Sequence, residues 1–539
     1  MSMVDITSPA FEEAVAEIVE AKTYNWIGDI NIEFVLASGY LVFIMQLGFA
    51  LLTIGAVRAK SAKSVALKNV MDVCAGGIGY YIFGWAFAYG DSERCCPAGN
   101  PFIGSQMFAL SGMPSTSYST FYFQFVFAIS TATIVSGAVA ERVRFMAYGM
   151  YALFLTAWVY PVLSHWVWSP TGWASTTRAD GPLLFGSGAY DTVGSGAVHM
   201  VGGVAGLAGA IVAGPRIGRF TADGKPVDMP GHNTIFYMMG VLLLWLGFYG
   251  FNPGTMGQII ATDGTDFAIV VARCAISTTM GACFGGCTAL VVSLIYYRIK
   301  EGKIIWDLGP CCNGALTGMV VITSGCATYE PWAAAIGGII GGLVVVPGGW
   351  FMLHVCKVDD PVDAFTVHGM GGALGVWWYS LAAKEGFVHE LYGATNPDGV
   401  TPRHYGWWMG DDATILGANT VWILVIFGWT MGMMLPFFYG LKLCGWLRVS
   451  AEEELAGVDV SKHGGHAYPG MEKVYDLEVA TNGMGDTLPS HKMRDSDDSN
   501  KGAPNDLQLR VRDLEAQLKQ VLAHQSNSTE QTPLNTTVV

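Results

Sequence analysis

The sequence predicts an all-α polytopic membrane protein with eleven transmembrane helices, arranged as two inverted five-helix repeats plus an extra helix. The first reason is composition: 52% of the 539 residues are hydrophobic, 13% are charged and the mean hydropathy is +0.39. Soluble proteins of this size are less apolar. Apolar segments of membrane-spanning length also recur along the chain, and one motif occurs twice. The net charge of -14 argues against a nucleic-acid partner.

The duplicated motif reads DTVGSGAVHMVGGVAG from Asp191 and DPVDAFTVHGMGGALG from Asp360, and the two copies align without a gap. Glycines follow each histidine, His199 or His368, at three, four and seven residues, so each histidine shares a helix face that allows close approach of two backbones. Asp191 and Asp360 are expected to cap these helices, and Asp363 is assigned to the second cap as well. Each histidine then lies about 12 Å inside its helix. Helices entering an apolar core of about 30 Å from opposite sides would bring the imidazoles together near its middle.

Three hypotheses explain such a pair. The histidines hydrogen-bond neighbouring helices, or they ligate a haem between them in a membrane redox protein, or they line a transport path. Ionisable groups inside lipid are costly and are usually functional, and inverted repeats with polar groups at the midplane are typical of transporters. The transport hypothesis is therefore preferred, and a Soret band in the purified protein would identify the haem alternative.

The connecting loops assign an orientation to the predicted helices. The predicted spans are 34–57, 68–89, 119–139, 145–167, 192–213, 232–252, 267–297, 308–327, 331–356, 362–383 and 414–443. One set of loops holds Arg58, Lys60, Lys63, Lys68, Arg142, Arg144, Arg216, Arg219, Lys225, Arg298, Lys300, Lys303 and Lys357. The other set and the N-terminus hold Lys22, Arg94, Arg178, Lys384 and Arg403. The positive-inside rule then places the N-terminus outside and the C-terminus inside.

The ends of the chain differ from the middle in composition. Residues 1–33 are predicted to form an extracellular N-terminal segment without a cleavable signal peptide. Residues 34–447 form the transmembrane domain, residues 448–480 a cytoplasmic regulatory tail, and residues 481–539 a disordered cytoplasmic tail. Heptad spacing at 507–522 indicates either a short coiled coil or a helix that forms only transiently.

The eleven cysteines show no metal-binding spacing, and no metal site is expected. Most of them are expected to be small packing residues. Cys95 and Cys96 are adjacent in a loop assigned to the outside, where disulfide formation and free thiols both stay open.

Several long motifs resemble those of one known family. They are YLVFIMQLGFALL, FAISTATIVSGAVAERVRF, YPVLSHWVWSPTGWA, GAVHMVGGVAGLAGAIVAGPRIGRF, WLGFYGFNPG, VDDPVDAFTVHGMGGALG and GVDVSKHGGHAY. Together they resemble the ammonium transporter, methylammonium permease and Rhesus family, and within it the plant-type ammonium transporter branch, over roughly residues 30 to 470. The resemblance implies a homotrimer with a pore through each subunit, ammonium or methylammonium as the substrate, no enzyme activity and no cofactor. The sequence leaves open which membrane is used, and the plasma membrane is the default expectation.

The resemblance also assigns roles to residues by their place in the motifs. It implies a pore pair that relays a proton, His199 and His368, an outer gate, Phe127 and Phe251, and an ammonium recruitment site, Trp168, Phe123 and Thr255, supported from behind by Asp191. An aromatic belt at the membrane surface is the alternative explanation for Trp168. Thr255 departs from the serine common at its place, and its extra methyl is expected to alter access for methylammonium.

The tail carries one further assignment. Ser461 stands in the D-x-[ST]-x-H-G context of plant-type members, in which phosphorylation by a kinase closes the pores. A phosphate adds nearly two negative charges, which is enough to release a segment held by a few polar contacts. An ordinary exposed serine is the alternative interpretation.

These residue types suit ammonium. Aromatic faces attract a cation by about 0.5–2 kcal/mol, and a hydroxyl accepts an N–H bond that potassium cannot donate. A bare cation in a narrow apolar pore is costly, so ammonium is expected to lose its proton and to pass as ammonia along the imidazoles. The sequence leaves open whether the proton also crosses, although the plant-type branch favours net charge transfer. The alternative function is an ammonium sensor that signals through the C-terminal tail.

Overall fold

The computed structural model describes residues 9–90, 100–261 and 267–468, and every regular element in these ranges is a helix, with η denoting 3₁₀ and π turns. The elements are α1 (Pro9–Ala56), η1 (Ala59–Ser61), α2 (Ala62–Gly79), η2 (Tyr80–Gly84), α3 (Trp85–Tyr89), η3 (Phe108–Leu110), η4 (Ser115–Ser117), α4 (Tyr118–Ala138), α5 (Phe145–Phe154), η5 (Leu155–Val159), α6 (Tyr160–Trp168), η6 (Ser195–Met200), α7 (Val201–Ala213), α8 (Thr234–Gly254), α9 (Ala268–Glu301), α10 (Leu308–Thr323), α11 (Pro331–His354), η7 (Phe365–Met370), α12 (Gly371–Ala382), α13 (Glu385–Tyr392), η8 (Trp407–Met409), α14 (Thr414–Leu443), α15 (Ala451–Ala456) and α16 (Val458–Lys462). The predicted all-α class is confirmed.

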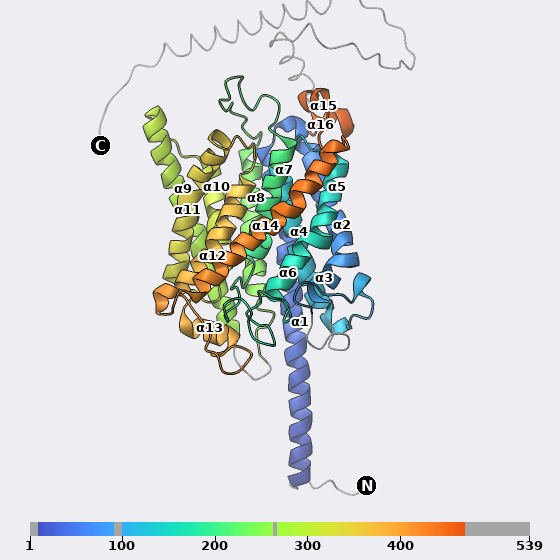
Figure 1. The fold of residues 1–539 in the computed structure, drawn as a ribbon, viewed down its shortest axis with the longest axis vertical. Helices are drawn as coiled ribbons and strands as arrows, with labels where there is room; N and C mark the ends of the chain where they lie inside the picture. Colours follow the sequence, from blue (N-terminus) through green and yellow to red (C-terminus); the bar gives the residue numbers. More distant parts are fainter. Residues whose placement is uncertain (1–8, 91–99, 262–266, 469–539) are drawn as a thin grey trace, which may run out of the picture. The chain divides into compact units, whose positions relative to one another are not determined.

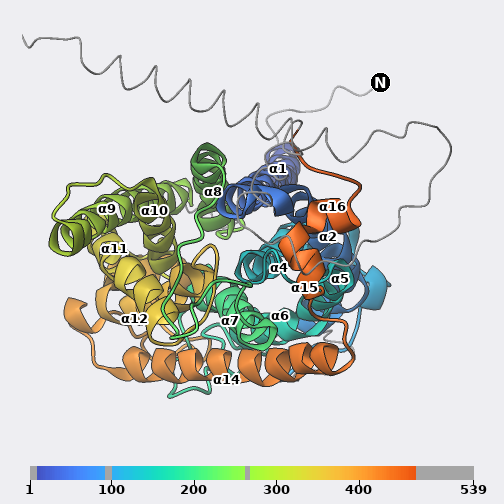
Figure 2. The ribbon, with the colours of Figure 1, turned by 90° about the horizontal axis from the view of Figure 1, so that it is seen from above.

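The helices form two groups that α14 joins. Seen from above, α1, α2, α4, α5 and α6 lie on one side, α9 to α12 lie on the other, and α14 runs along both groups (Figure 2). The N-terminal part of α1 projects beyond the bundle at one end, and α15 and α16 lie at the opposite end (Figure 1).

Most of the predicted spans appear as long apolar helices. Among the described residues, nine helices are long and apolar enough to cross a membrane. The predicted spans 308–327 and 362–383 appear instead as the 16-residue helix α10 and as η7 continuing into α12. The count of eleven spans and the orientation of the termini therefore stay predictions. The first apolar span begins at Asn25, inside the 48-residue helix α1, earlier than the predicted residue 34.

A buried ionic cluster ties the two groups together at the end near α15. Arg216, just after α7, donates from Nε to Asp359 at 2.9 Å and from Nη1 to Glu141 at 2.5 Å. All three residues are at most 3% exposed. Burial alone would raise the pKa of Asp359 and Glu141, but the hydrogen bonds and the charge of Arg216 outweigh it and lower both pKa values. Their contribution to stability is therefore present at neutral pH and is lost only when the pH falls through these lowered values.

The first part of the tail packs on the same end of the bundle. The Asp459 carboxylate accepts hydrogen bonds from the backbone N–H groups of Ser64 and Lys63, at 2.7 and 2.9 Å, and so meets the N-terminus of α2, where a negative charge is favourable. Glu454 accepts a bond of 2.7 Å from the N–H of Ile217 and pairs with Arg448 at 2.8 Å. The tail thus touches the chain directly after Arg216.

We predict that Asp359→Asn lowers the thermal unfolding midpoint of the detergent-solubilised protein. The substitution removes the charge that compensates Arg216, and breaking a buried pair in this way costs about 3–5 kcal/mol. Asp223→Asn is the matched control, because Asp223 and its partner Lys225 are largely exposed, and no change in the midpoint is expected. Equal midpoints for the two variants would contradict a stabilising role of the cluster.

Candidate functional site

An aromatic and polar cavity of about 370 Å³ opens beside the loop that precedes η6. The sequence-predicted residues Trp168, Phe127, Thr255 and Asp191 line it. Trp168 donates from its indole Nε1 to the backbone oxygen of Asp191 at 2.8 Å, which fixes the ring against the cavity. The Thr255 hydroxyl donates to the Phe251 carbonyl at 2.8 Å, so its oxygen lone pairs can accept bonds from a bound molecule. Phe123 packs against Phe127, with ring centroids 4.8 Å apart, and is not among the described residues that line the cavity.

Two phenyl rings stack at this cavity, and one of them, Phe127, lines it. Phe127 of α4 and Phe251 of α8 lie nearly parallel, with centroids 3.9 Å apart and an interplanar angle of 12°. Both are at most 1% exposed. A hydrated ion cannot pass two rings in such contact unless they move. The predicted gate residues are therefore brought together.

The two predicted histidines meet below these rings. The Nδ1 atoms of His199 and His368 are 3.2 Å apart, and the imidazoles are nearly parallel. The His199 ring also lies 5.3 Å from Phe251 and 5.4 Å from Phe248, measured between centroids. In a neutral pair, one Nδ1 donates and the other accepts, so one Nε2 is left as an acceptor and the other as a donor. The haem hypothesis is wrong, because the direct contact leaves no room for a porphyrin between the rings.

The histidine helices cross through their glycines. A methyl group added at Gly203 would lie 2.2 Å from the backbone nitrogen of Gly369, beside His368. A methyl group at Gly372 would lie 2.3 Å from the backbone oxygen of Ser195, in the turn that holds His199. Each copy of the motif therefore packs its second glycine on the other copy's histidine turn, as the duplicated sequence predicts. Both histidines lie in π turns, η6 and η7, which occur often at functional sites.

Asp191 is held as a cap. Its carboxylate accepts bonds from the N–H groups of Ala197 and Gly196, at 2.7 and 3.1 Å, and from the Ser324 hydroxyl at 3.0 Å. The helix begins at Ser195 and not directly after Asp191, since Gly194 adopts a left-handed conformation with φ 101°. Burial raises the pKa of Asp191, and these N–H donors act against that rise.

A second cavity, of about 470 Å³, is lined by Asp360 and Asp363 and by Phe365 and Thr366 of η7, the turn that holds His368. Asp360 caps η7, since its carboxylate accepts a bond of 2.9 Å from the N–H of Phe365. The Asp363 carboxylate instead accepts from the side-chain amide of Asn313, at 3.1 Å, whose oxygen accepts from the Tyr237 hydroxyl at 2.5 Å. The cavity therefore carries a polar chain on its wall.

Several residues around the site were not predicted from the sequence. Phe248 lies one turn before Phe251 and faces His199, which helical spacing alone would have indicated. Ser324 and Trp422 support Asp191 from 133 and 231 residues away, and no local pattern marks them.

The predicted phosphorylation site, Ser461, is exposed in α16, and its hydroxyl donates to the Gly457 carbonyl at 3.0 Å. Cys95, Cys96 and the heptad segment 507–522 lie outside the described residues.

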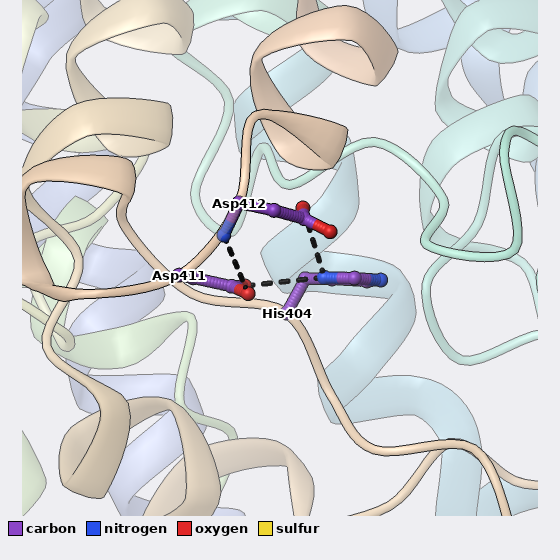
Figure 3. A group of neighbouring side chains, drawn as sticks. All are labelled: His404, Asp411 and Asp412. Atoms are coloured by element: carbon purple, nitrogen blue, oxygen red, sulfur yellow. Dashed lines mark hydrogen bonds and ion pairs between the residues drawn. The ribbon is translucent and has the colours of Figure 1, made fainter.

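A histidine and two aspartates also meet in the loop before α14 (Figure 3). His404 Nδ1 lies 3.1 Å from an Asp411 oxygen and 3.5 Å from an Asp412 oxygen. The same carboxylates accept bonds from the backbone N–H groups of Tyr405 and Thr414, at 2.6 and 2.8 Å. We assign this group to holding the loop and the start of α14, because these oxygens are already engaged by the backbone.

Comparisons with known proteins identify the family of this chain. Residues 33–468 match the model of the Ammonium Transporter Family. Ammonium transporter 1 member 3 of Solanum lycopersicum is 46% identical over 451 residues, which cover 82% of this chain and 94% of that protein. Ammonium transporter 1 member 1 of Arabidopsis thaliana is 44% identical over 424 residues, covering 78% and 81%.

Two solved structures share the fold. The protein titled Sensor Amt Protein has a TM-score of 0.69 at 30% identity, covering 81% of this chain and 99% of that one. Mep2 of Candida albicans has a TM-score of 0.66 at 23% identity, covering 79% and 87%. The family resemblance of the motifs is thereby confirmed: this chain belongs to the ammonium transporter family and is a multi-pass membrane transporter of ammonium.

Proposed function

We propose that the protein recruits ammonium in the cavity beside Trp168, removes its proton, and conducts ammonia past the histidine pair with net movement of charge. The observation that carries this proposal is the direct contact of His199 with His368 beneath the stacked rings of Phe127 and Phe251. A buried imidazole pair offers both a hydrogen-bond donor and an acceptor along an otherwise apolar wall.

The outer cavity supplies two kinds of attraction for ammonium. The faces of Trp168 and Phe127 attract the positive charge, and the Thr255 hydroxyl accepts an N–H bond. Asp191 holds the backbone around Trp168 rather than facing the ion, since its oxygens are engaged by Ala197, Gly196 and Ser324. Phe123 acts by supporting the Phe127 ring.

The stacked phenyl rings separate this cavity from the imidazoles. A charged ion loses its hydration there, at a cost that an uncharged ammonia molecule avoids. The proton travels separately, because one ring nitrogen of the neutral imidazole pair accepts a proton while another donates one. Net charge transfer is what the resemblance of the sequence motifs to the plant-type branch implies. A homotrimer with one pore in each subunit is the assembly that the family resemblance implies, and the plasma membrane is its default location.

We predict that the double variant His199→Ala, His368→Ala loses ammonium-induced current in oocytes. Without the imidazoles, the apolar passage offers neither a relay for the proton nor hydrogen bonds for ammonia. The expected loss is about tenfold or more, measured by voltage clamp and normalised to surface abundance. His354→Ala is the control, because His354 lies on the exposed end of α11 and bonds the Trp350 carbonyl. Wild-type current in the double variant would refute the relay.

We also propose that phosphorylation of Ser461 by a kinase releases the tail and closes the pore. Ser461 lies in the last turn of α16, where a phosphate opposes the helix dipole, and its hydroxyl bond to Gly457 would be lost. The same short helix carries Asp459, whose contacts with Ser64 and Lys63 hold the tail on α2. Disrupting α16 therefore removes that contact.

We predict that Ser461→Asp abolishes most of the ammonium current, whereas Ser461→Ala preserves it. Asp459→Ala should resemble Ser461→Asp, because both substitutions weaken tail docking. The measurement is ammonium-induced current at equal surface abundance, accompanied by limited proteolysis of the tail. Full current in Ser461→Asp with an undocked tail would separate docking from gating and refute the proposal.

A second candidate function is ammonium sensing through the tail. It is favoured by the likeness to the protein titled Sensor Amt Protein and by the chain that continues beyond the family match at residue 468. Deleting residues 471–539 distinguishes the two: retained current with loss of an ammonium-dependent cellular response supports a dual role, and an unchanged response excludes the sensor.

A further inference from the structure

One polar group on the wall of the outer cavity has no hydrogen-bond partner within the described part of the chain. Gln124 of α4 lines the cavity together with Trp168 and Thr255. Its side-chain oxygen, Oε1, is buried, and no donor among the described residues hydrogen-bonds to it. Buried amide oxygens are nearly always bonded, and leaving one without a partner is unfavourable. This oxygen is therefore available to a molecule in the cavity.

The position of Gln124 on α4 directs its amide toward the proposed ion path. Gln124 precedes Phe127 by three residues, so the two side chains share a helix face. Phe127 lines the same cavity and stacks on Phe251. The amide thus lies about one helical turn from the gate, on the cavity side, close to the proposed recruitment residues.

The neighbouring hydroxyl groups offer an alternative explanation for the unpaired oxygen. Tyr89 lines the same cavity, and its hydroxyl is 2.9 Å from that of Ser164. The hydroxyls of Tyr80 and Tyr160 are buried without a partner among the described residues, and their rings lie 6.4 Å apart. A purely structural role would connect Gln124 with this group of hydroxyls, and the experiment below separates the two roles.

We propose that Gln124 Oε1 accepts an N–H bond from ammonium in the outer cavity and is a selectivity determinant beside Trp168 and Thr255. This inference rests on the proposed recruitment site. Ammonium carries four tetrahedral N–H donors, and aromatic faces attract its charge without using them. The Thr255 hydroxyl accepts one and the Gln124 amide accepts a second. Potassium replaces its hydration shell best in a ring of carbonyl oxygens, which one amide and one hydroxyl do not provide.

The test is Gln124→Met, which keeps the length of the side chain and removes its acceptor. The half-saturating ammonium concentration is expected to rise about three- to tenfold, with the maximal current within about twofold of wild type, and potassium should compete more strongly. Currents are measured by voltage clamp in oocytes at equal surface abundance. Gln124→Asn, which withdraws the amide by one methylene, should give a smaller rise.

Two controls make the outcome decisive. Tyr160→Phe removes a hydroxyl from the buried group and should leave the half-saturating concentration unchanged, whereas Trp168→Leu removes an aromatic face from the cavity and should raise it. An unchanged value in Gln124→Met, or an equal rise in Tyr160→Phe, overturns the inference. If Trp168→Leu also leaves the value unchanged, the recruitment site itself is wrong; if only Gln124→Met does, this inference alone fails.

Discussion

The free energy of placing a charge in an apolar passage is the constraint on which the rest of this molecule depends. The rings of Phe127, Phe251 and Phe248 lie beside the imidazoles of His199 and His368, which line the path in the proposed mechanism. A hydrated cation has no replacement for its water in such surroundings. In the proposed mechanism, separation of the proton from ammonia resolves this difficulty with groups that are already present. The proposed role of the aromatic cavity is to concentrate and sort cations before that step.

The contacts that hold the histidine pair in place join helices that are far apart in the sequence. Two helices from distant parts of the chain cross at Gly203 and Gly372, and buried charges fix their ends. Arg216 follows the first helix and binds Asp359, which precedes the cap of the second. At the opposite end, Asp191 is bonded to Ser324 and lies within reach of Trp422. The tail adds a contact at Ile217, next to Arg216, so its docking acts on residues that already join the two helices.

The sequence predicted those features that depend on local spacing or on a repeated motif. The pairing of His199 with His368 was predictable because the same spacing of histidine and glycines occurs twice. The places of Phe127, Phe251 and Trp168 came from the family resemblance, since an aromatic residue in an apolar segment carries no mark of function. The partners of Asp191 and the Asp363–Asn313 contact were not predictable, because they join helices far apart in sequence. The first span starts earlier than predicted because α1 is long. The turn η6 starts later than predicted because Gly194 has a left-handed φ.

The glycine crossing has a mechanical consequence. At Gly203 and Gly372 backbone meets backbone, without flexible side chains between the helices to absorb a displacement. The crossing of the two histidine helices is therefore rigid, because backbone atoms of one helix touch backbone atoms of the other. In the proposed mechanism, any change in conduction then comes from the parts on either side of this crossing, namely the stacked rings on one side and the docked tail on the other.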